Sequence, residues 1–172
     1  MPEARGAADR PQTDEVDRIV AAWVRERPDL DFSPLQVFSR LSRLSKHLDR
    51  ARRTAFDRSE LESWEFDVLS ALRRSGAPYQ LSPTALVTQT MVSSGTMTNR
   101  IDRLVGRRLV VRRADPHDRR AVLVRMTEDG LLKADAAITR LVAAERAILD
   151  TLAPEQQSLL SNLLRTLSLD FD

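Results

Sequence analysis

Residues 81–130 read LSPTALVTQTMVSSGTMTNRIDRLVGRRLVVRRADPHDRRAVLVRMTEDG, and they contain the most informative pattern of the chain. Its first part contains two helix starts. Ser82 precedes Pro83, whose fixed φ suits the first position of a helix, and Ser93 or Ser94 is placed to cap a second helix. In that second helix the apolar residues recur at spacings of three and four. A short helix followed closely by another predicts a helix-turn-helix.

The hydrophobic period changes after the second helix. Residues 109–111 and 122–124 are short runs of Leu and Val, and they flank the charged segment ADPHDRR, which is typical of a β-hairpin with a polar tip. Thr127, followed by two acidic residues, is a further helix start. Helix, helix and hairpin in this order predict a winged helix-turn-helix with a two-stranded β-wing.

Helical patterns continue on both sides of this segment. Apolar residues recur at spacings of three and four in three longer stretches, 13–27, 33–58 and 128–152. Ser59 and Glu62 have the spacing of a capping box, which predicts that another helix begins there. Residues 1–12 are polar, with two Pro, and are expected to form a disordered tail. The fold class is therefore mainly α, with longer helices flanking the winged helix.

The composition excludes several classes of protein. The chain has 172 residues with 27 Lys and Arg against 25 Asp and Glu, yet residues 100–125 alone hold nine Arg and three Asp. A concentrated basic segment on a nearly balanced chain indicates a local site for a polyanion. With no Cys and two His, we expect no disulfide, metal or cofactor. No apolar run approaches the roughly 18 residues of a membrane span, and we expect a cytoplasmic protein without a secretory signal.

The second helix of the helix-turn-helix has the side chains of a DNA-reading element. Short polar groups near its start suit the base edges of the major groove, and cations along it suit phosphates. An Arg at the hairpin tip suits the narrow minor groove. The candidate DNA-binding residues are Ser82, Ser93, Ser94, Thr96, Thr98, Asn99 and Arg103 in the helices and His117, Asp118, Arg119 and Arg120 in the hairpin.

The same residues resemble the winged helix of the multiple-antibiotic-resistance regulator (MarR) family. The family signature D-x-R…T-x-x-G is matched by residues 118–120 together with Thr127 and Gly130. The resemblance implies a homodimer that binds a palindromic operator, with Arg120 reaching the minor groove and Asp118 orienting it. It also implies a transcription regulator, most often a repressor, that responds to a small anionic or phenolic ligand.

The flanking helices fit the dimer that this resemblance implies. Reading helices of a dimer must lie about one DNA turn apart, about 34 Å, and the terminal helices have apolar stripes to spare for setting that distance. We therefore expect N-terminal helices for dimerisation and ligand binding over 13–58, the DNA-binding domain over 59–127, and C-terminal dimerisation helices over 128–172. The alternative is that 128–169 packs on the core of its own subunit.

A ligand site is implied by a closer resemblance. The extra helix over 13–27 and the segment WEFDVLSALRRSG are similar to the urate-responsive branch of the family, which implies that Trp23, Asp67, Arg100 and Arg112 bind a ligand. Ser63 stands where that branch has a second acidic residue, so another carboxylate or a phenolic compound fits as well as urate. The alternative is that Trp23 belongs to a core and that Asp67 and Arg100 form a structural ion pair.

Two other functions fit the sequence less well than a DNA-binding regulator. A winged helix that serves as a protein-interaction module should have an apolar, weakly charged reading helix, and residues 93–103 are polar and basic instead. An enzyme should show a nucleophile with its base, a glycine-rich phosphate loop or metal-ligand spacing. The sequence has none of these patterns, so we expect no catalytic activity.

Overall fold

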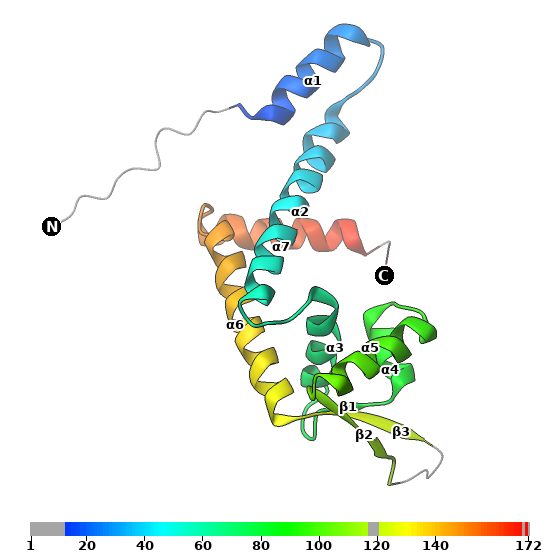
Figure 1. Ribbon diagram of the computed structural model, residues 1–172. Coiled ribbons are helices and arrows are strands. Elements are labelled where there is room, and N and C mark those ends of the chain that lie inside the picture. Colours follow the sequence, from blue (N-terminus) through cyan, green and yellow to red (C-terminus); the bar gives the residue numbers. More distant parts are fainter. Residues whose placement is uncertain (1–12, 117–120, 170, 172) are drawn as a thin grey trace, which may run out of the picture. The chain divides into compact units, whose positions relative to one another are not determined.

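The computed structural model describes residues 13–116, 121–169 and 171, and within them it contains seven helices and three strands (Figure 1). The predicted mainly helical class is confirmed. The chain divides into two compact units between Asp49 and Arg50, and each unit is described by itself.

The first unit contains helix α1 (Glu15–Glu26) and the beginning of helix α2 (Ser33–Asp57). Asp14 caps α1, because its side chain accepts hydrogen bonds from the backbone N–H groups of Val16 and Asp17. Arg40 of α2 donates to the carboxylates of Asp14 and Asp17, and this double ion pair fastens the two helices together.

The second unit is built around helix α3 (Ser63–Arg74). The predicted capping box of Ser59 and Glu62 is wrong, because the helix begins at Ser63 and not directly after Ser59. Glu62 is the N-cap residue, and its backbone N–H donates to Glu65 at 2.9 Å. Ser59 instead donates to the carbonyl of Ala55, because it lies in the turn that follows α2, where Glu60 has a φ of 54°.

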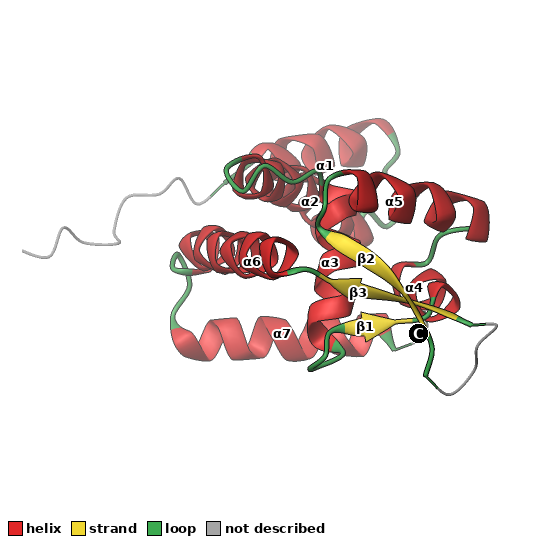
Figure 2. Ribbon diagram, turned by 60° about the horizontal axis from the view of Figure 1, so that its bottom comes forward, coloured by secondary structure: helices red, strands yellow, loops and turns green. Residues whose placement is uncertain are grey.

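The helix-turn-helix and the wing follow α3 in the predicted order. Strand β1 (Gln80–Leu81) leads into helix α4 (Pro83–Thr90), helix α5 (Ser94–Gly106), and strands β2 (Val110–Ala114) and β3 (Val122–Met126). The sheet is antiparallel with the order β1-β3-β2, and Figure 2 shows the three strands side by side. The hairpin register places Val110 opposite Met126. The predicted two-stranded wing is confirmed, and β1 adds a short third strand to it.

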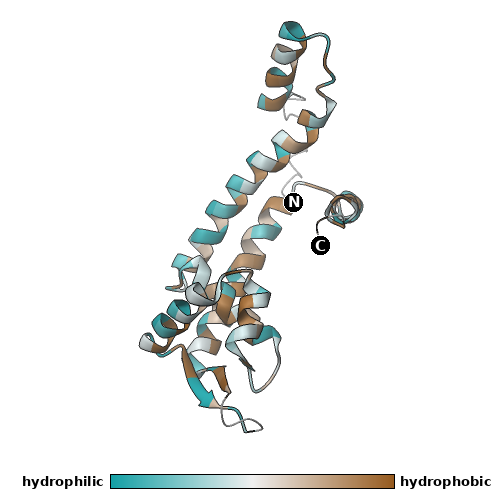
Figure 3. Ribbon diagram, turned by 90° about the vertical axis from the view of Figure 1, so that its right-hand side faces the viewer, coloured by the Kyte–Doolittle hydropathy of each residue, from teal (hydrophilic) through white to brown (hydrophobic). Residues whose placement is uncertain are grey.

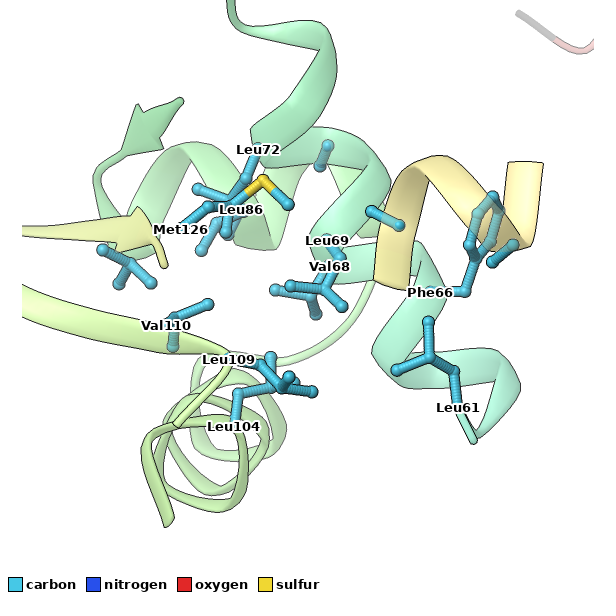
Figure 4. Packing of buried hydrophobic residues seen from close by; sticks show 14 of the residues in the cluster. Leu61, Phe66, Val68, Leu69, Leu72, Leu86, Leu104, Leu109, Val110 and Met126 are labelled. Carbon is cyan, nitrogen blue, oxygen red and sulfur yellow. The ribbon is translucent and has the colours of Figure 1, made fainter. Parts of the chain in front are cut away.

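The core of this unit fixes the position of α5. Val68, Leu69 and Leu72 of α3 are fully buried, and they belong to one cluster with apolar side chains of α4, α5, β2 and β3 (Figure 4). Each buried aliphatic side chain contributes about 1.5–3 kcal/mol to folding. The partners that Figure 4 labels are Leu86 of α4, Leu104 of α5, Leu109, Val110 and Met126.

Helices α6 (Glu128–Leu149) and α7 (Pro154–Ser168) differ in how they pack. Helix α6 contributes Ala134, Ala137 and Leu141 to the core. Helix α7 buries none of its residues, although it is rich in Leu. None of the helices in the described part of the chain has both the length and the apolar character that crossing a membrane requires.

Candidate nucleic-acid interface

Serine side chains start both helices of the helix-turn-helix. Ser93 Oγ accepts a hydrogen bond from the backbone N–H of Thr96 at 3.3 Å, and Ser82 Oγ accepts one from Ala85 at 3.2 Å. These bonds satisfy N–H groups that have no partner within a helix. The hydroxyls of Ser82 and Ser93 therefore cap the two helices, in addition to any contact with DNA.

The outer face of α5 displays the other predicted reading residues. Met97, Ile101 and Leu104 are buried, and the polar residues between them therefore lie on the opposite side of the helix. Ser94, Thr96, Thr98 and Asn99 are all exposed. Their short side chains lie in the first two turns of α5, the part of the helix nearest the N-terminus, where helices bind phosphates and approach base edges.

Arg103 contacts two residues at the start of α3 that the sequence did not mark as DNA-binding. Its Nη2 donates to Glu62 Oε1 at 2.6 Å, and its guanidinium lies 4.6 Å from the centre of the Trp64 ring. The other oxygen of Glu62 accepts the indole N–H of Trp64 at 2.6 Å. The Trp64 hydrogen bond and the Arg103 charge hold the pKa of Glu62 below its usual value, although desolvation opposes them.

A hollow of about 450 Å³ opens beside this group. Trp64 forms one wall and the outer face of α5 forms the other. Arg100 also lies over the Trp64 ring, at 5.7 Å from its centre. The hollow thus combines an aromatic wall with two guanidinium groups and short polar side chains; its lining residues are Trp64, Gly95, Thr96, Asn99, Arg100 and Arg103.

The structure brings together two of the four predicted ligand residues. Asp67 of α3 lies close enough to Arg100 of α5 for its titration to respond to that charge. Arg112 of β2 pairs instead with Asp102 of α5 at 2.7 Å, which joins the wing to the reading helix. Trp23 belongs to the first unit, where it stacks on Phe32 at 5.9 Å between ring centres and remains half exposed.

The carboxylate of Asp67 is partly shielded from water by its surroundings, although the residue lies at the surface of α3. This desolvation raises its pKa above the ordinary 3.8, while the charges of Arg100, Arg52 and Arg74 act in the opposite direction. The pKa of Asp67 is therefore higher in the folded protein than in the unfolded chain. As the pH rises from the unfolded-state pKa through the folded-state pKa, ionisation of Asp67 lowers the free energy of unfolding.

We expect the Arg100→Ala variant to raise the pKa of Asp67 further, because it removes the strongest of the three opposing charges. NMR titration of the Asp67 carboxyl carbon in both proteins measures this. Arg74→Ala is the matched control and should give a smaller rise. An unchanged Asp67 pKa in Arg100→Ala would contradict the proximity of the two side chains.

The wing presents further cations to solvent. Arg112 and Arg113 are exposed, and Figure 3 shows the end of strand β2 in hydrophilic colours. The predicted tip residues His117, Asp118, Arg119 and Arg120 lie outside the described residues. Over the described ranges, no group of three His, Asp or Glu side chains is arranged to hold a metal ion.

A second cluster of charged residues lies at the C-terminal end of α5. Glu65 is fully buried and pairs with Arg107, which follows α5 and also donates to the carbonyl of Glu60 at 2.6 Å. The side chain of Glu60 pairs with Lys133 of α6. This chain of contacts connects the end of the reading helix to α6.

Comparison with known proteins gives the same family for sequence and fold. Residues 59–121 match the model described as MarR family. The transcriptional regulator PecS of Dickeya dadantii is 39% identical over 150 residues, covering 87% of this chain and 90% of PecS. The transcriptional repressor NicR of Pseudomonas putida is 33% identical over 113 residues, covering 63% of this chain and 70% of NicR.

A solved structure shows the same similarity in the fold. BpsR of Bordetella bronchiseptica, whose DNA binding is regulated by 6-hydroxynicotinic acid, superposes with a TM-score of 0.65 at 29% identity, covering 81% of this chain and 96% of BpsR. The chain therefore belongs to the MarR family: it is a DNA-binding transcription regulator with a winged helix-turn-helix, and not an enzyme.

Proposed function

We propose that the protein is a repressor that binds a palindromic operator as a homodimer and is released by a small anionic or phenolic ligand. The observation that carries the DNA-binding part is the outer face of α5, where Thr96, Thr98 and Asn99 are exposed and Arg103 shares one hollow with Thr96 and Asn99. Short polar side chains suit base edges, and the guanidinium suits a phosphate. As a DNA-binding regulator it would act in the cytoplasm.

Apolar surface on the last two helices supports the homodimer. Helix α7 buries nothing within its own chain, and large aliphatic side chains remain exposed along it and along the outer side of α6. Exposed large apolar side chains on helices that leave them unburied in their own chain are typical of protein interfaces. A second copy is the occupant we propose, because two reading helices are needed for a palindrome. The exposed residues are Ile138, Val142, Leu149, Leu159, Leu163, Leu164 and Leu167.

Two observations support a ligand that acts through the reading helix. Arg100 lies on α5 itself and is attracted by Asp67 of α3, so an anion that captures Arg100 would compete with Asp67 and bias the position of α5. BpsR responds to 6-hydroxynicotinic acid, which combines a carboxylate with a hydroxylated aromatic ring. We propose a ligand of that class, whose carboxylate is bound by Arg100 in competition with Asp67.

The test of this function begins with a duplex that the protein selects from a randomised DNA pool. A palindrome should emerge, and sedimentation should give two chains per duplex. Binding should weaken with salt, with a log-log slope of about −0.9 per phosphate contact. Added 6-hydroxynicotinate should release the wild-type protein from the duplex, and the Arg100→Ala variant should stay bound.

Two variants locate the phosphate contacts. Arg103→Ala should reduce the magnitude of the salt slope by about one unit, and Arg165→Ala, an exposed cation on α7, should leave the slope unchanged. If no sequence emerges from the pool and binding shows no dependence on salt, the DNA-reading assignment of α5 is wrong, and a protein-interaction module becomes the better explanation.

A further inference from the structure

We propose that Trp64 is a positioning residue for DNA binding: its indole ring, together with the Glu62 carboxylate, holds the Arg103 guanidinium in one orientation on the surface of α5. The inference rests on the proposed function, in which Arg103 contacts a phosphate. Trp64 lies on α3, outside the helix-turn-helix and the wing. It would act on DNA chiefly through Arg103, whose guanidinium lies 4.6 Å from the centre of its ring, nearer than that of Arg100 at 5.7 Å.

Two contacts restrain Arg103. Its Cζ lies over the Trp64 ring at 4.6 Å from the ring centre, which keeps the guanidinium against that ring. Glu62 Oε1 holds one of its N–H groups at 2.6 Å, which limits its rotation there. Glu62 is itself oriented by the indole N–H, which its other oxygen accepts. The three side chains therefore form a closed set of contacts.

The restrained guanidinium keeps donors free for DNA. A guanidinium has five N–H donors in a planar fork, and the hydrogen bond to Glu62 uses one of them, on Nη2. About half of the Arg103 side chain is exposed, at 53%. A flexible Arg loses rotamer freedom when it binds a phosphate, and a guanidinium that is already oriented loses less. Trp64 thus increases affinity without touching DNA.

The neighbouring hollow shows where the oriented group would act. Thr96 and Asn99, both predicted to read bases, line the same 450 Å³ space as Arg103 and Trp64. A phosphate bound by Arg103 at this place would lie beside the base edges that α5 reads. By orienting Arg103, Trp64 at the start of α3 would help to fix the position of α5 along the duplex.

The test uses the full chain and a duplex that it selects from a random pool. Trp64→Leu fills much of the volume but lacks a ring face, and Trp64→Phe keeps a ring face. We expect Trp64→Leu to weaken binding about three- to tenfold and to reduce the magnitude of the salt slope, as Arg103→Ala does. Trp64→Phe should stay closer to wild type in both measurements.

The double variant separates positioning from a general loss of structure. Because Trp64 acts through Arg103, Trp64→Leu combined with Arg103→Ala should bind as Arg103→Ala alone does. Additive losses, or a Trp64→Leu variant with wild-type affinity and slope, would overturn the inference while the DNA contact of Arg103 stands. If Arg103→Ala itself has no effect, the proposed phosphate contact and the positioning role both fail.

Folding is monitored by thermal unfolding of each variant, because Trp64 also packs against the hydrophobic core. If Trp64→Leu does not fold, Trp64→Met replaces it, since Met fills irregular space flexibly and has no ring face. Fluorescence gives a second readout. In the Trp23→Phe background Trp64 is the one remaining Trp of the chain, and its emission should change on addition of the duplex; unchanged emission would contradict a bound phosphate beside it.

Discussion

Replacement of Gly130 with Ala is expected to lower the free energy of unfolding by about 3 kcal/mol. A Cβ on Gly130 would lie 2.1 Å from the carbonyl oxygen of Leu109 and 3.1 Å from its carbonyl carbon. Both are backbone atoms, and they cannot rotate away as the end of a flexible side chain could. The only relief is to move α6 as a whole away from the turn between α5 and β2.

That movement would break the hydrogen bonds by which α6 begins. The backbone N–H of Thr127 donates to the Leu109 carbonyl at 3.1 Å, and the N–H of Gly130 donates to Thr127 Oγ1 at 3.0 Å. The Thr127 hydroxyl in turn lies 2.8 Å from the carbonyl oxygen of Arg108, to which it donates. A buried polar group left without its partner costs about 1–3 kcal/mol, so the backbone of α6 cannot shift without further loss.

Urea denaturation of the wild type and the Gly130→Ala variant measures the effect. Gly106→Ala is the matched control, because a Cβ at Gly106 meets nothing within 4 Å. In the last turn of α5 that methyl group should be neutral or slightly stabilising, since Ala is the better helix former. Equal midpoints for Gly130→Ala and wild type would mean that α6 does not begin against Leu109.

Local signals in the sequence explain why much of the fold could be predicted. The caps at Ser82, Ser93 and Thr127 involve N–H groups only three residues away, so they appear in the sequence as spacings. The predicted order of helix-turn-helix and wing is confirmed for the same reason. The proposed cap at Ser59 is wrong because the competing pair of Glu62 and Glu65 has the same spacing.

Contacts between distant residues explain what could not be predicted. Arg103 and Glu62 are 41 residues apart, and no periodic pattern connects them. Trp64 on an amphipathic helix has the pattern of a core residue, and it does pack partly against the core. The role of Gly130 was visible as a family signature alone, since the close approach of Leu109 requires the folded backbone. The proximity of Asp67 and Arg100 was suggested by resemblance, and the pairing of Arg112 with Asp102 was not foreseen.

Replacement of Arg107 with Met is expected to lower the free energy of unfolding by about 3 kcal/mol, because it leaves the buried carboxylate of Glu65 without its cation. Glu65 is completely buried, whereas the side chain of Arg107 is 38% exposed. The expected loss is therefore at the lower end of the range for a broken buried ion pair. Within the described part of the chain, Glu65 Oε1 already has no hydrogen-bond partner, so little remains to offset the charge.

The Arg103–Glu62 pair is a matched control in the same protein. It also joins α5 to the start of α3, but its two side chains are 53% and 56% exposed. Exposed ion pairs contribute about 0–1 kcal/mol, so Arg103→Met should change the urea midpoint much less than Arg107→Met. Similar losses in the two variants would show that burial of Glu65 is not what makes its pair important.

A second replacement at Glu65 separates the cost of an unpaired charge from the cost of lost packing. In the Arg107→Met background, Glu65→Leu removes the buried carboxylate and substitutes an apolar side chain of similar size. Replacing both members of a buried pair is often neutral or stabilising, while removing one is not. The double variant should therefore be more stable than Arg107→Met alone, although it loses the Glu65 bond to the Glu62 N–H. If the double variant were the less stable of the two, packing of Arg107 and the start of α3, rather than charge compensation, would account for the importance of this ion pair.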